Sequence, residues 1–141
     1  MKKRWSAVFC SALLGVLLTI LPSAGHDHTG PNPLLEEMIL LDATFREVVS
    51  AVALGDGARV GKALHAMHGT MEKTHKGVRE GSVVIHKNAG RMNEFVAMDK
   101  DFHNTLDALA ESAHRNDGKK MLSLTKKLLD GCVQCHQTFR K

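Results

Sequence analysis

The sequence predicts an all-α protein, an antiparallel up-down four-helix bundle, from three features. From residue 34 onward, apolar residues recur at alternating spacings of three and four, which places them on one side of a helix. Turn sequences such as Gly55-Asp56-Gly57 and Asn116-Asp117-Gly118 divide this pattern into segments. No sustained alternation with the period of a strand competes with it. Four amphipathic segments with mostly short connections favour a bundle.

The beginning of the chain differs in composition from the helical part. Three basic residues (2–4) precede an uncharged, largely apolar run (5–21), and residues 22–25 supply the small side chains of a cleavage site. This order is typical of a secretory signal peptide, so we expect residues 1–25 to be removed and the mature protein to be periplasmic. An uncleaved anchor is the alternative, although the apolar run is slightly short for a membrane span.

Removal of this segment changes the meaning of the basic composition. The chain has 19 Lys and Arg residues and 15 Asp and Glu residues. Three of the basic residues and none of the acidic ones lie before residue 25, which leaves a net charge of +1 on the mature chain. No basic patch suited to nucleic acid remains. We therefore expect neither a nucleic-acid partner nor, after cleavage, a membrane.

The mature chain is expected to have a flexible lead over residues 26–32 and a helical domain over residues 33–141. Asn32 is a suitable N-cap and Pro33 a suitable first residue for the first helix. Glu37, in the first turns, favours the positive end of the helix dipole. The apolar face of this helix comprises Leu34, Met38, Leu41, Phe45, Val48 and Val52.

Three further helices are predicted in the same way. The apolar face of the second comprises Val60, Leu64, Met67 and Met71. A looser stretch is expected from Gly77 to about Gly90. The apolar face of the third helix comprises Met92, Phe95, Phe102, Leu106, Leu109 and Ala113. Asp117 is expected to cap the fourth helix, whose apolar face comprises Met121, Leu128, Cys132, Cys135 and Phe139.

The segment Cys132-Val133-Gln134-Cys135-His136 carries the predicted chemistry. Two thiols at this spacing can add to the vinyl groups of haem, and the adjacent imidazole then binds the iron. On a helix, Cys132 and Cys135 share one face. A disulfide here would close only a small loop, a zinc site needs more ligands, and a thioredoxin-like pair is expected near a βαβ pattern. We therefore predict one haem c per chain, with Cys132 and Cys135 as thioethers and His136 as the proximal iron ligand.

The ending Cys135-His136-Gln137-Thr138-Phe139-Arg140 resembles that of the class II c-type cytochromes, which include cytochrome c′ and its low-spin relatives. The helix order of the whole mature chain is similar to theirs as well. The resemblance implies a four-helix bundle. It also implies a position near the haem for Arg140, where the charge would make oxidation of the iron more costly. The alternative is a solvated arginine at the negative end of a helix dipole.

The sixth ligand of the iron separates the two leading functions. A methionine suits electron transfer, whereas an open position binds gases such as NO and CO, as in cytochrome c′. We predict Met38, because it lies one turn into the first helix, beside the end of the fourth. The segment Leu35-Glu36-Glu37-Met38 also resembles the corresponding segment of the Met-ligated bundle cytochromes. The alternative is a methionine that fills a gap in the core.

The nine histidines raise a further possibility. A polar face at helical spacing comprises His65, His68, Glu72 and His75. Such a face can bind zinc or copper, although a solvated face is the commoner use of this pattern. His65 or His68 is also an alternative sixth ligand if the second helix is rotated. Elsewhere, Asp99 lies one turn before His103.

Together these features predict a soluble monohaem cytochrome that carries electrons between redox partner proteins and is not an enzyme. A five-coordinate, gas-binding protein similar to cytochrome c′ is the alternative. A histidine-rich, metal-binding bundle with a structural haem is a third interpretation. Both a monomer and a homodimer are compatible with the sequence.

Overall fold

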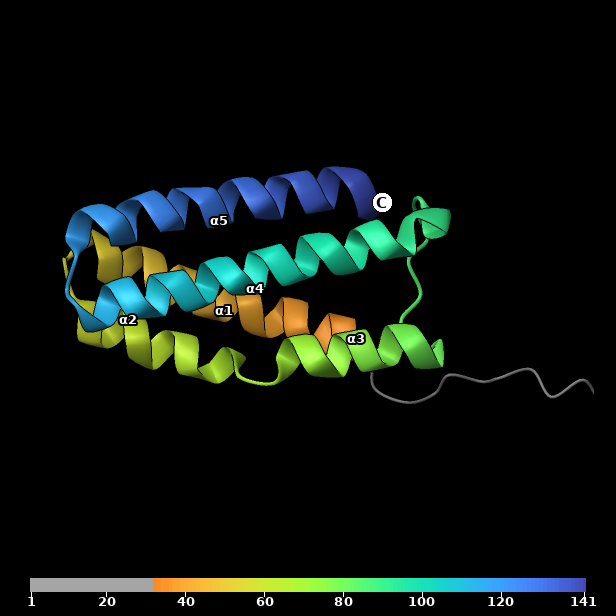
Figure 1. Cartoon of the computed structure of the whole chain (residues 1–141), viewed down its shortest axis with the longest axis horizontal. Helices are drawn as coiled ribbons and strands as arrows, with labels where there is room; N and C mark the ends of the chain where they lie inside the picture. Colours follow the sequence, from red (N-terminus) through yellow and green to blue (C-terminus); the bar gives the residue numbers. More distant parts are fainter. Residues whose placement is uncertain (1–31) are drawn as a thin grey trace, which may run out of the picture.

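The computed structural model describes residues 32–141, which form helices and their connections (Figure 1). This part of the chain has no β-strand, so the all-α prediction is confirmed. The predicted signal peptide (1–25) and the predicted lead up to residue 31 lie outside the described residues. None of the described helices is both long enough and apolar enough to cross a membrane.

The helices begin and end close to where the sequence predicted. They are α1 (Pro33–Ala53), α2 (Gly57–Leu64), the 3₁₀ turn η1 (His65–Met67), α3 (Thr70–Glu80), the 3₁₀ turn η2 (Ala89–Arg91), α4 (Met92–His114) and α5 (Gly118–Phe139). Two predicted caps are confirmed. Asn32 Oδ1 accepts the N–H of Leu34 at 3.1 Å, and Asp117 Oδ1 accepts the N–H of Lys120 at 3.0 Å.

The second helix is interrupted, and the prediction of one continuous element was wrong. After η1 the chain leaves helical geometry at His68 (φ −60°, ψ 127°) and turns at Gly69, which has a φ of 77°. Glycine adopts that left-handed conformation without the steric cost of a Cβ. A new helix, α3, then continues past Gly77, where the looser stretch was expected to start, as far as Glu80.

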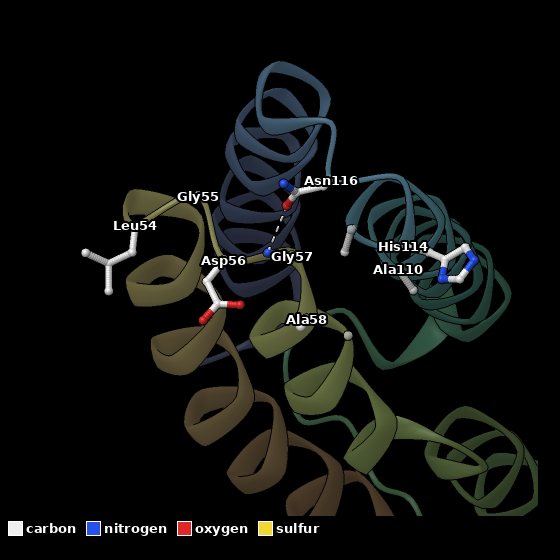
Figure 2. A pocket seen from close by; sticks show the side chains of 10 residues that line it. Leu54, Gly55, Asp56, Gly57, Ala58, Ala110, His114 and Asn116 are labelled. Atoms are coloured by element: carbon white, nitrogen blue, oxygen red, sulfur yellow. Dashed lines mark hydrogen bonds between the residues drawn. The ribbon is translucent and has the colours of Figure 1, made fainter.

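The helices lie alongside one another, with their connections gathered at two ends (Figure 1). Helix α5 packs against α4 and α1, and α2 packs against α1 and α4. At one end, the turn between α1 and α2 meets the turn between α4 and α5. There the Gly57 N–H donates to Asn116 Oδ1 at 3.3 Å, the dashed line in Figure 2.

At the other end, the loop over residues 82–88 holds the end of α5. The Asn88 side-chain amide donates to the carbonyl of Thr138 at 2.7 Å, and Lys87 Nζ donates to the carbonyl of Gln137. These carbonyls belong to the last turn of a helix, where no further backbone N–H follows to satisfy them. The loop therefore supplies the donors that end α5.

Two clusters of buried apolar side chains fill the interior. The larger one comprises Val48, Ala51, Val60, Leu64, Met67, Leu106, Leu109, Ala113, Met121, Leu124 and Leu128. The smaller one, at the end where α5 terminates, comprises Val83, Ile85, Phe95 and Phe139. In it the rings of Phe95 and Phe139 meet edge to face, with centroids 5.6 Å apart. Cys135 packs against this smaller cluster.

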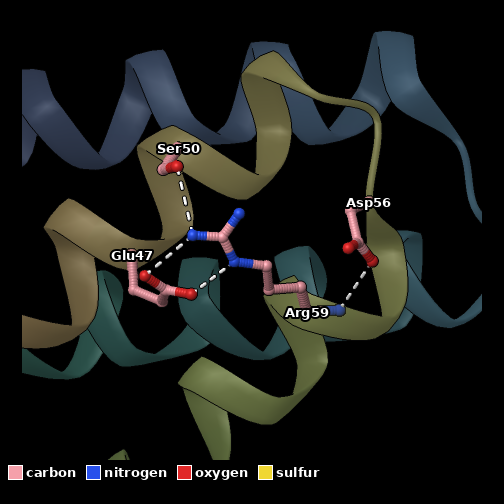
Figure 3. Close-up of polar contacts among 4 residues, drawn as sticks. All are labelled: Glu47, Ser50, Asp56 and Arg59. Atoms are coloured by element: carbon pink, nitrogen blue, oxygen red, sulfur yellow. Dashed lines mark hydrogen bonds and ion pairs between the residues drawn. The ribbon is translucent and has the colours of Figure 1, made fainter.

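Arg59 connects α2 to α1 (Figure 3). Its guanidinium donates to both carboxylate oxygens of Glu47, at 2.5 and 3.1 Å, and to Ser50 Oγ at 3.2 Å. Its backbone N–H donates to Asp56 Oδ1 at 2.9 Å. The hydrogen bond from Arg59 lowers the pKa of Glu47. Because these groups are solvent-exposed, screening keeps the stabilisation small, and the contact mainly orients α2 on α1.

Gly57 is predicted to be essential for the close approach of the two turns. A Cβ at Gly57 would lie 2.4 Å from the carbonyl oxygen of Ala113, whereas a Cβ at Gly61, one turn later in α2, would meet nothing within 4 Å. Gly57→Ala should therefore destabilise the fold by about 1–3 kcal/mol. Gly61→Ala should stabilise it by about 0.5–1 kcal/mol, because alanine loses less backbone entropy in a helix.

Urea unfolding of the two variants, followed by circular dichroism at 222 nm, measures both free energies. Equal unfolding midpoints for the two variants would contradict this account of the turn.

Candidate functional site

A cavity of about 810 Å³ lies at the end of the molecule where α5 terminates. Residues of α1, the loop over residues 82–88, α4 and α5 form its walls. The walls are mostly apolar and include Leu41, Phe45, Ile85, Phe95, Phe102 and Phe139. Its size lies in the range of pockets that hold small ligands and cofactors, which are likewise largely apolar with a few polar groups.

All the site residues predicted from the sequence line this cavity: Met38, Cys132, Cys135, His136 and Arg140. Helix α5 presents the two cysteines three positions apart, and each is a half-buried free thiol. Met38 is half-buried and reaches the cavity from the beginning of α1. The fold thus brings a residue from the start of the domain next to a motif almost a hundred positions later.

Met38 is distinguished from the other methionines by its position. Among the methionines of residues 32–141, it alone lines the cavity. Met67 and Met121 are buried in the larger apolar cluster, and Met92 and Met98 pack against the smaller one. Its thioether therefore shares the cavity with His136 and belongs to a different helix.

Of the histidines in residues 32–141, His136 and His86 line the cavity, and sequence reasoning missed His86. His86 follows the short apolar run Val83-Val84-Ile85 in a loop, so no helical spacing marked it as a ligand. The predicted alternatives, His65 and His68, are exposed beside the interruption of the second helix and do not line the cavity. That interruption also breaks the helical spacing on which the predicted polar face of the second helix depended.

The environment of the motif sets the protonation of its groups. Burial raises the pKa of the Cys132 thiol. Burial, together with the charges of Asp99 and Cys132, raises the pKa of Cys135 to about 11. Partial burial and then the charge of Arg140 lower the pKa of His136, which favours the neutral imidazole that binds metals. Both thiols are therefore protonated at neutral pH.

Positive charge gathers at the cavity wall. Arg46, Arg140 and Lys141 all contribute to the lining. Arg46 pairs with Asp42 at 2.7 Å, but Arg140 has no ion-pair partner within the described part of the chain. Asp99 also lines the cavity, so the lining carries charges of both signs. Arg140 is the cation there that could meet a carboxylate of a large apolar ligand.

Gly131 lies directly before the motif and faces α4. A Cβ at this position would be 3.2 Å from Cδ2 of Phe102, whose ring lines the cavity. The missing side chain of Gly131 lets α5 approach the Phe102 ring, and a larger residue would push that ring.

A second cavity, of about 720 Å³, lies at the opposite end of the molecule (Figure 2). It is lined by the turn between α1 and α2 and by the end of α4. Asp56 and Asn116, two of its polar groups, already accept the N–H groups of Arg59 and Gly57. Among residues 32–141, no group of three or more metal-ligating side chains converges here, so the first cavity is the candidate functional site.

Comparison with known proteins gives no match for this chain among family models, curated proteins or solved structures. The function is therefore inferred from the residues of the cavity.

The thiols provide a test of this environment. At pH 8 a thiol with a pKa of about 11 is ionised to about one part in a thousand, whereas an unperturbed thiol is ionised to about one quarter. In the reduced, haem-free chain we expect Cys135 to react with iodoacetamide roughly tenfold or more slowly than in the same chain unfolded in urea.

The rate at Cys135 should still be rising with pH at pH 10, whereas the unfolded chain should level off earlier. Mass spectrometry of the modified peptide measures both rates. Identical pH profiles in the two states would show that Cys135 is not buried as described.

Proposed function

We propose that this protein is a periplasmic electron carrier, a c-type cytochrome of class II with one covalently bound haem c. The observation that supports this most directly is the convergence of Met38, Cys132, Cys135 and His136 on one cavity. In this proposal the described helices form the antiparallel up-down four-helix bundle of that class. The segment α2–η1–α3 is then its interrupted second helix.

The residues of the cavity fit the group that the motif implies. Cys132 and Cys135 would hold a haem covalently, each thiol adding across one vinyl C=C bond with its hydrogen going to the neighbouring carbon, so that no oxidant is needed. His136 would supply an imidazole ligand to the iron and Met38 a thioether ligand. When bound, the haem supplies a one-electron couple whose potential the protein sets.

The remaining residues of the cavity adjust the reduction potential of that couple. The aromatic and aliphatic walls exclude water, and exclusion of water disfavours the more highly charged, oxidised state. Met38 acts in the same direction, because thioether ligation raises the reduction potential. Arg140, at the end of α5 and without an ion-pair partner in residues 32–141, adds positive charge that opposes oxidation and can meet a haem carboxylate.

The surroundings of the cavity favour transient contact with redox partner proteins. Exposed apolar side chains occur on both helices that border it, with Leu35 and Ile39 on α1 exposed by 58% and 64%, and Leu129 and Val133 on α5 by 52% and 46%. Weak electron-transfer complexes typically have small contact areas, and these exposed side chains would supply one. We propose this region as the place where electrons enter and leave.

The second candidate is a gas-binding haem protein with a five-coordinate iron. It is favoured by the apolar neighbours of Met38 on α1, because Leu34, Leu41 and Phe45 line the same cavity and would surround an open coordination position. The two functions differ in whether the Met38 sulfur binds the iron.

Optical spectra of the mature protein test both candidates. We expect covalently bound haem by mass spectrometry and low-spin spectra, ferric and ferrous, that carbon monoxide does not change. Met38→Leu should give a high-spin form that binds carbon monoxide and has a lower reduction potential. Met98→Leu, a matched change at a half-buried methionine outside the cavity, should leave the spectra as they are.

Each other outcome has a defined meaning. Absence of covalent haem in the wild-type protein rejects the function. A wild-type spectrum that shifts on carbon monoxide supports the gas-binding alternative. If Met38→Leu has no effect but His86→Ala does, His86 is the sixth ligand instead.

A further inference from the structure

A second group of metal-ligating side chains lies buried beside the cavity, between α1 and α4. Glu37 of α1 is 1% exposed, and Asp99 and His103 of α4 are 6% and 9% exposed. Each can offer one oxygen or nitrogen atom such that the three atoms all lie within 4.8 Å of one another. His103 Nε2 lies 2.8 Å from Glu37 Oε1. The sequence predicted that Glu37 would favour the positive end of the helix dipole, but it did not predict that this side chain would be buried.

Two buried oxygen atoms of this group, Glu37 Oε2 and Asp99 Oδ2, accept no hydrogen bond from the described residues. Asp99 Oδ2 does lie 2.8 Å from His75 Nε2, whereas Glu37 Oε2 has no ion-pair contact there. An isolated buried carboxylate oxygen is costly, and almost all such atoms in folded proteins are paired with a donor or a metal ion. Glu37 Oε2 belongs to a carboxylate that converges with Asp99 and His103, so its free lone pair is available where a cation would bind.

The spacing of the group matches that of a metal site. Ligand atoms about 2.1 Å from a metal ion are about 3.0 Å apart when they subtend a right angle, and about 4.2 Å apart when they are opposite. The 2.8 Å contact between His103 and Glu37 corresponds to adjacent ligands. The three ligand atoms are at most 4.8 Å apart, so they would move only slightly closer together to bind one ion.

His75 of α3 is placed to orient Asp99. Its Nε2 lies 2.8 Å from Asp99 Oδ2, and its side chain is 15% exposed. Neither atom makes a hydrogen bond in this arrangement. A small rotation of the imidazole would give the carboxylate a donor, as is common for carboxylates and histidines that bind metal ions.

We propose that Glu37, Asp99 and His103 form a binding site for one divalent first-row transition metal ion. The donor set of two carboxylates and one imidazole suits Zn²⁺, Mn²⁺ or Fe²⁺, whereas Ca²⁺ favours oxygen atoms alone. The double positive charge balances the two buried carboxylates. Asp99 also lines the haem cavity, but none of the proposed haem ligands takes part, so this inference does not depend on the proposed function.

Zinc is the probe for the experiment. The purified protein, carrying whatever haem it holds, is treated with a chelator, desalted and titrated with ZnCl₂ by calorimetry. The zinc content after gel filtration is measured by elemental mass spectrometry. We expect one zinc ion per chain, bound with a Kd on the order of 1 µM or tighter. Glu37→Gln and Asp99→Asn, which keep the side-chain shape, should each weaken binding tenfold or more.

The matched control is the double variant His65→Gln/His68→Gln, which removes two exposed imidazoles whose rings lie 4.8 Å apart. It should bind zinc as the wild type does. If this control alone loses zinc, the surface pair is the site and the proposal is wrong. The proposal is equally wrong if the wild type binds no stoichiometric zinc, or if both carboxylate variants bind it normally.

Circular dichroism checks that the variants fold. A second experiment uses only the wild-type protein and so does not depend on the variants. Anomalous diffraction at the zinc edge, from crystals grown with zinc, should give a peak between Glu37, Asp99 and His103. A peak elsewhere, with none at this position, would overturn the proposal.

Discussion

The arrangement of the cavity depends on one constraint, the fixation of the last turn of α5. Helix ends fray when nothing holds them, and the cysteine motif lies within the last two turns of its helix. Here Phe139 is buried against Phe95, and Lys87 and Asn88 donate to the last carbonyls. Asn88 accepts the left-handed φ of 57° that this turn of the chain requires. These contacts hold the two thiols in a fixed position relative to α1.

Two consecutive residues at the start of α1 face different environments. Glu37 points to the interior and Met38 to the cavity, because successive side chains on a helix are separated by about 100°. Burial of the carboxylates of Glu37 and Asp99 in the interior costs electrostatic free energy. Burial and the charge of Glu37 raise the pKa of Asp99 to about 6. A fold selected only for packing would place apolar residues here, so these carboxylates are retained against a cost in stability.

Much of the fold and of the cavity was predictable because the signals are local. Caps such as Asn32 and Asp117 act within one turn, and the cysteine spacing is defined within five residues. The interruption at Gly69 was missed, since an isolated glycine is usually a small cost within a helix and not a break. The burial of Glu37 was not predicted, because its partner, His103, is 66 positions away. His86 belongs to a loop, where no periodicity reports which way a side chain faces.

The break at Gly69 separates two helices that pack on different parts of the domain. Helix α2 packs on the larger apolar cluster, whereas α3 runs beside the beginning of α1 and α4. A chain without continuous helical hydrogen bonds across residues 68–69 can open α3 while the larger cluster remains folded. The end that carries the ligating side chains is then the first to exchange its amide hydrogens. A ligand that had to leave before α3 opened would slow that local exchange as well as raise the global free energy of unfolding.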